Sequence, residues 1–92
     1  MPYQQQQQQR KNKRLSKAIT GAANNGGLIR ITCTGHTLAT GQRVTITGVG
    51  GTTEANAANW RITVITANTF DLVGSTFTNA YTSGGTATRT HG

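Results

Sequence analysis

The chain has 92 residues, a formal net charge of +7 at pH 7, one cysteine, and Glu54 and Asp71 as its two acids. One cysteine excludes an intrachain disulfide, and neither His36 nor His91 has a Cys or His companion at metal-ligand spacing. No apolar run approaches the roughly 20 residues that span a membrane. We therefore predict one domain with no metal, no cofactor, no membrane contact and no enzymatic activity.

The first seventeen residues differ in composition from the rest. Residues 4–9 are all glutamine, and five basic residues follow without an acid: Arg10, Lys11, Lys13, Arg14 and Lys17. Such a segment buries too little apolar surface to offset the entropy of ordering it. We predict a basic N-terminal arm at residues 1–17, disordered or extended. Three roles are open to it: binding nucleic-acid phosphates, docking in an acidic groove of a protein shell, or acting as a solvated tail.

Residues 18–27 are expected to link this arm to the body. Residues 15–22 are compatible with a short helical turn, which Gly21 and the asparagine–glycine cluster at 24–27 would end.

The body, residues 28–92, consists of short runs in which apolar and polar residues alternate. This period of two is typical of half-buried strands, and it predicts strands at 28–34, 42–47, 60–66, 69–73 and 85–90. In the fourth run, Asp71 is expected to point outward. The apolar positions expected to face inward are Ile29, Ile31, Cys33, Val44, Ile46, Trp60, Ile62, Val64, Phe70 and Leu72.

The connections between these runs predict turns. Ala67 and Asn68 suit a two-residue hairpin turn, because asparagine tolerates positive φ. The run Gly48–Val49–Gly50–Gly51 lacks the Lys-Ser/Thr pair and the helix of a phosphate-binding loop, so we interpret it as a turn. We expect His36 to form a loop-stabilising hydrogen bond rather than to serve as a ligand or general base. The fold class is therefore all-β, a small five- to six-stranded barrel.

Several separated motifs resemble one known family. They are Gly35-His36-Thr37-Leu38-Ala39-Thr40-Gly41-Gln42-Arg43-Val44-Thr45-Ile46, Gly48-Val49-Gly50-Gly51 with Asn56, the hairpin from Trp60 to Leu72, and Tyr81-Thr82-Ser83-Gly84-Gly85. In this order they resemble the small β-barrel family named after the first catalytic cysteine half-domain of ubiquitin-activating enzymes. The resemblance covers residues 28–89. It departs from the family at Thr37, an insertion in the usual His-Gly-Leu opening, and at Trp60, where tyrosine is common.

The resemblance implies a function, since versions of this family are abundant in structural proteins of tailed phages and prophages. It implies a virion protein assembled in the host cytoplasm, most concretely a capsid decoration or cement protein. Its partners would be the major capsid protein and other copies of itself. A nucleic-acid-binding accessory protein and a neck or tail component are the alternatives.

The aromatic residues admit two interpretations. Trp60, Phe77 and Tyr81 resemble a stacking platform for single-stranded nucleic acid, but few basic residues are interleaved with them. We therefore expect Trp60 in the core and Phe77 and Tyr81 as loop anchors. Besides the five basic residues of the arm, Phe77 and Tyr81 are the predicted partner-contacting residues.

Overall fold

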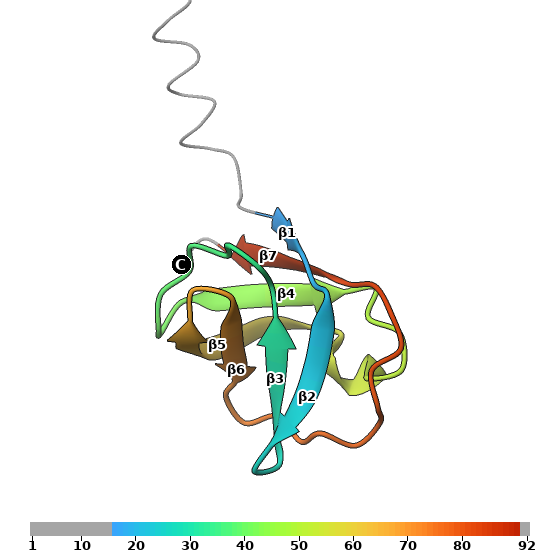
Figure 1. The fold of residues 1–92 in the computed structure, drawn as a ribbon. Coiled ribbons are helices and arrows are strands. Elements are labelled where there is room, and N and C mark those ends of the chain that lie inside the picture. Colours follow the sequence, from blue (N-terminus) through green and yellow to red (C-terminus); the bar gives the residue numbers. More distant parts are fainter. Residues whose placement is uncertain (1–15, 91–92) are drawn as a thin grey trace, which may run out of the picture.

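The computed structural model describes residues 16–90 and has seven β-strands and one 3-10 helix in that range (Figure 1). The elements are β1 (Ser16–Ala18), β2 (Gly21–Asn25), β3 (Leu28–Thr32), β4 (Arg43–Thr47), η1 (Thr53–Ala55), β5 (Ala57–Thr66), β6 (Thr69–Leu72) and β7 (Thr86–Thr90). The all-β class is confirmed. Within residues 16–90, no helix is long and apolar enough to cross a lipid bilayer.

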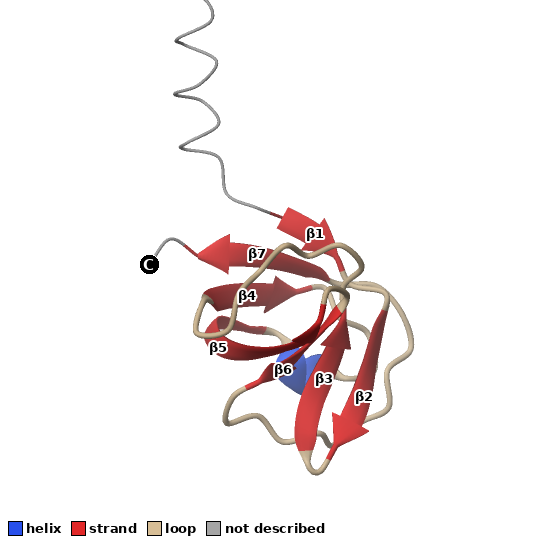
Figure 2. Cartoon of the chain, turned by 60° about the vertical axis from the view of Figure 1, so that its left-hand side comes forward, coloured by secondary structure: helices blue, strands red, loops and turns tan. Residues whose placement is uncertain are grey.

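The strands form one antiparallel sheet in the order β1-β7-β4-β5-β6-β3-β2. Strand β5 has 10 residues, and it pairs with β4 near its start and with β6 near its end. It therefore belongs to both halves of the sheet, which curve around a common interior (Figure 2). Strands β1 and β2 end the order and do not pair with each other, so a closed barrel stays a prediction.

The prediction for the segment before Leu28 was wrong. Instead of a helical turn and a linker, it contains β1 and β2, so the sheet has seven strands rather than five or six. Ser16 lies opposite Thr88 of β7, and Ala23 lies opposite Arg30 of β3. Neither Ser-Lys-Ala nor Gly-Ala-Ala-Asn-Asn alternates in hydropathy. These residues become strands because an existing strand offers each of them a partner, not through a pattern of their own.

The alternation within the body is confirmed as the source of the core. The inward residues of the central strands are fully buried, namely Ile29, Ile31, Cys33, Val44, Ile46, Ile62, Phe70 and Leu72. Val64 and Trp60 pack against this cluster while only partly buried. The two-residue turn at Ala67 and Asn68 joins β5 to β6 as predicted, but Asn68 does not adopt the positive φ on which the prediction relied.

Asp71 was expected to point outward, and it does lie on the outer face of β6, opposite Thr63 and Arg30. Its exposure is nevertheless only 5%. The side chain is covered because Arg30 of the adjacent strand β3 and Asn25 of β2, the next strand beyond it, bond to the carboxylate. A carboxylate with such partners can leave water at little net cost.

Candidate functional site

His36, the one histidine that the structure describes, is a structural group. It is 1% exposed, and its Nδ1 accepts a hydrogen bond from the Leu38 N–H at 2.9 Å. Its Nε2 lies 2.9 Å from the Thr66 carbonyl oxygen, so Nε2 carries the proton. The ring also meets the Phe70 ring edge-on, with centroids 5.4 Å apart. The predicted loop-stabilising role is confirmed, because both ring nitrogens are occupied by the backbone.

Glu54 of η1 fixes the loop that precedes β7. Its carboxylate accepts hydrogen bonds from the backbone N–H groups of Thr78 and Asn79 and from the Asn79 side-chain amide. Partial desolvation raises the pKa of Glu54, but the hydrogen bonds from Asn79 and Thr78 outweigh it and lower the pKa to about 2. The ionised carboxylate thus makes a structural contact that depends on its negative charge.

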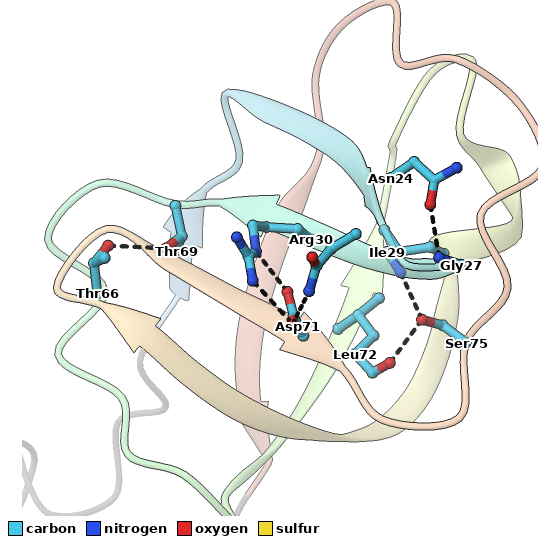
Figure 3. Close-up of polar contacts among 10 residues, drawn as sticks. Asn24, Gly27, Ile29, Arg30, Thr66, Thr69, Asp71, Leu72 and Ser75 are labelled. Carbon is cyan, nitrogen blue, oxygen red and sulfur yellow. Dashed lines mark hydrogen bonds and ion pairs between the residues drawn. The ribbon is translucent and has the colours of Figure 1, made fainter.

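Asp71 forms the centre of a polar cluster on the outer face of β2, β3 and β6 (Figure 3). Its Oδ1 accepts from Arg30 Nε at 2.8 Å, and its Oδ2 accepts from Asn25 Nδ2 at 2.8 Å. The hydrogen bond to Asp71 raises the pKa of the Arg30 guanidinium above its ordinary value. Glu54 and Asp71 therefore have separate partners on separate elements and form no acid–base pair.

Ser75 shows the same use of polar groups for structure. Its hydroxyl donates to the Leu72 carbonyl at 2.6 Å and accepts from the Ile29 N–H at 2.9 Å (Figure 3). Every buried side-chain nitrogen and oxygen among residues 16–90 has a hydrogen-bond partner.

The glycine run at 48–51 forms a turn, as predicted. Asn56 spans it, because its side-chain oxygen accepts from the Val49 N–H at 2.9 Å and its amide donates to the Val49 carbonyl at 3.0 Å. Gly50 forms an antiparallel bridge with Ser83. The N–H groups of Val49 and Gly50 are therefore bonded to protein acceptors and are not free to bind a phosphate.

Cys33 lies in the core, 0% exposed, and burial raises the pKa of its thiol. A raised pKa keeps the thiol protonated, which is the opposite of an activated nucleophile. Among residues 16–90 there is no group of three His, Cys, Asp or Glu side chains that could bind a metal ion.

The structure places three of the seven predicted contact residues. Lys17 is half-buried in β1, opposite Ala87 of β7. Phe77 and Tyr81 are partly buried and pack against the core, and the Tyr81 hydroxyl donates to the Gly84 carbonyl at 2.9 Å. Both therefore anchor the loop before β7, as expected. The remaining four lie outside the described residues: Arg10, Lys11, Lys13 and Arg14.

Sequence reasoning missed a pair of arginines. Arg43 of β4 lies directly opposite Arg61 of β5, and both side chains are exposed. Each was correctly expected to point outward, but the register that brings them together depends on a bulge in β5 between the pairs at Val44 and Ile46. A bulge of this kind leaves no clear signal in sequence.

The comparison with protein-family models agrees with this architecture. Residues 23–91 match the model of the ubiquitin-activating enzyme E1 FCCH domain. No curated protein matches the chain. Since the family match covers most of the chain, from within β2 through β7, this protein belongs to the FCCH domain family of ubiquitin-activating enzymes E1.

Proposed function

We propose that the protein is a structural component of a tailed-phage virion, most concretely a decoration or cement protein of the capsid. The supporting observation is the use of its polar groups. The described histidine and both acids, namely His36, Glu54 and Asp71, are all engaged in hydrogen bonds that maintain the fold. Family membership adds to this, because versions of the fold are abundant in phage structural proteins. The protein acts through its shape and its contacts, not as an enzyme.

The mechanism that we propose is mechanical. The body is a small barrel closed through the segment between β1 and β2, and closure is supported by two hydrogen bonds. The Ile19 N–H donates to the Gly85 carbonyl and the Thr20 N–H donates to the Thr32 carbonyl, each at 2.9 Å. The barrel sits on or between major capsid subunits, and residues 1–15 lie along a neighbouring subunit. Two attachment points and many copies raise the effective affinity of weak contacts.

A nucleic-acid-binding accessory protein is the second candidate. It is favoured by the four basic residues between positions 10 and 14, which no acid balances. In that case the arm would neutralise phosphates, and binding would fall steeply with salt. A neck or tail component remains a variant of the structural role with fewer copies per virion.

A charge-neutralised variant separates the two functions. A truncation that starts at Ala18 would remove Ser16 and Lys17 from β1, so the arm is better altered by replacing Arg10, Lys11, Lys13 and Arg14 with glutamine. The full chain and this variant are then titrated against duplex DNA and against shells of the major capsid protein whose gene lies nearest. Both titrations are run at physiological salt.

The expected result is saturable binding of the full chain to shells, with loss of affinity in the variant and little binding to DNA. Strong DNA binding that the four substitutions abolish, without shell binding, would replace the cement proposal by the accessory one. Copy number per virion then distinguishes a capsid location from a neck or tail location.

A further inference from the structure

The outer face of the sheet carries a row of exposed side chains on β4, on β5 and on the residue that follows β6. Arg43 and Arg61 are register partners, and directly opposite residues of an antiparallel pair share a face with Cβ atoms about 5 Å apart. Val73 continues the row, because its N–H donates to the Arg61 carbonyl at 2.9 Å. We call these three residues the Arg43–Arg61–Val73 row; the strands that carry it lie side by side in Figure 2.

The row lowers the stability of the fold. Like charges directly opposite in a sheet are destabilising, and the one ion pair among residues 16–90 joins Arg30 to Asp71. The other described acid, Glu54, is bonded to the Thr78–Asn79 loop. Nothing within the described body therefore neutralises Arg43 and Arg61, and an incoming anion would relieve their repulsion.

The third member of the row indicates which kind of anion fits. Val73 is 44% exposed, and the large hydrophobics that residues 16–90 expose are Val73 and Ile65, both aliphatic. Nucleic-acid surfaces of this type use exposed aromatic rings to stack bases. The described aromatics instead belong to the core or pack against it, namely Phe70, Trp60, Phe77 and Tyr81. An aliphatic side chain next to two guanidinium groups suits a protein segment that carries both carboxylates and an apolar residue.

We propose that the Arg43–Arg61–Val73 row is a docking surface for an acidic segment of a partner protein. Carboxylates of the segment bind the two guanidinium groups, and an aliphatic side chain of the segment packs on Val73. Arginine suits this role because its planar fork binds a carboxylate through two hydrogen bonds. The row is a contact separate from the basic arm, and it does not depend on the virion role, since any protein with such a segment would fit.

The test uses the full 92-residue chain and three probes: a peptide that alternates glutamate with valine, one that alternates glutamate with serine, and a single-stranded oligothymidylate of equal charge. Binding is followed by NMR at the side-chain N–H signals of Arg43 and Arg61 and the methyl signals of Val73. Residue-specific signals are needed because the arm also attracts anions. Arg61→Gln is compared with Arg89→Gln, which removes the same charge from the same fold outside the row.

The expected result is a shift of all three residues' signals, with the valine peptide binding more tightly than the serine peptide. Arg61→Gln should weaken binding at these signals by about two- to fivefold, the range of an exposed ion pair, and Arg89→Gln should change it less. Val73→Ser should remove the preference for valine.

Three outcomes would overturn the proposal. Equal binding of both peptides would show that Val73 makes no apolar contact with the segment. Equal effects of Arg61→Gln and Arg89→Gln would show that binding depends on the overall positive charge and not on the row. Larger shifts of the row by oligothymidylate than by either peptide would make it a nucleic-acid surface. Each of these outcomes would leave the virion proposal intact, because that proposal is tested on the arm and on capsid shells.

Discussion

Glu54 illustrates how single charged residues act in this protein. It lies on η1, yet its bonds reach the backbone of Thr78 and Asn79, some 24 and 25 residues later in the chain. A carboxylate that accepts several N–H bonds stays ionised at low pH. The side chain therefore ties two connections together through its charge.

The first prediction concerns this contact. Glu54→Gln keeps the size of the side chain but removes the charge, so the free energy of unfolding at pH 7 should fall by about 1 kcal/mol. Because the pKa of Glu54 is lowered in the fold to about 2 from 4.5, its contribution is complete above about pH 4.5 and is lost as the pH falls toward 2. Urea unfolding at several pH values measures both effects.

Wild type and variant should therefore differ at pH 7 and converge near pH 2. A constant difference across this range would show that the lost stability comes from packing and not from the charge. Residues outside this contact titrate equally in both proteins, so the comparison isolates Glu54.

Residue roles were predictable where sequence neighbours decide them. His36 stands in a turn without a nearby carboxylate, and the structural role expected from that position is confirmed. The burial of Asp71 was not foreseen, because it depends on Arg30 and Asn25, which are 41 and 46 residues away. The period of two assigns Asp71 to the correct face, but it cannot reveal that two side chains from other strands cover it.

At the scale of elements, the glycine turn after β4 is defined by how closely it meets the loop before β7. Gly50 and Ser83 form a bridge, and the Thr82 N–H donates to the Gly50 carbonyl at 3.0 Å. Gly51 has φ +79, and a Cβ there would lie 2.1 Å from the Ala80 carbonyl oxygen. Glycine is therefore required at this position for two reasons, its backbone angle and its missing side chain.

The second prediction separates these reasons. Gly51→Ala should lower the free energy of unfolding by about 3–4 kcal/mol, since the strain of positive φ adds to an overlap that only a backbone shift can relieve. Gly74→Ala is the matched control. Gly74 has φ +80, but a Cβ there would have no atom within 4 Å, so its loss should be about 1 kcal/mol.

Both variants are measured by urea unfolding under the same conditions. Equal losses would mean that the two loops do not pack as closely as the bridge between Gly50 and Ser83 implies.

Strands β1 and β2 mark where prediction from sequence fails at this scale. The strands with buried alternating residues, such as β3 and β4, were found within two residues of their bounds. Strand β2 has five residues, and none of them is fully buried. Its extended conformation depends on pairing with β3, which is a tertiary effect that local composition does not reveal.

At the scale of the whole molecule, the two ends of the described chain are joined. Ser16 lies opposite Thr88, and their hydroxyl oxygens are 3.3 Å apart across a separation of 72 residues. Pairing β1 with β7 requires nearly the whole chain to be in place. The fold thus depends on contacts between residues that are distant in sequence.

The third prediction follows from this topology. Because long loops must close before such contacts form, refolding should take milliseconds to seconds rather than microseconds. Trp60 is the only tryptophan and packs against the core, so its fluorescence in stopped-flow experiments reports folding. Far-UV circular dichroism, followed in parallel, should give the same rate.

A dominant phase in microseconds would contradict this expectation. Different rates from the two probes would show that β-structure forms before the core around Trp60 is packed.

The junction of β1 and β2 has a mechanical consequence. The chain that enters the fold at Ser16 bonds first to β7 and then, after Ile19 and Thr20, to β3. A force applied along the preceding residues therefore loads the pairing of β1 with β7 before the pairing of β2 with β3. A tether attached at this point is held by two pairings in series, so β1 must separate from β7 before the load reaches β3.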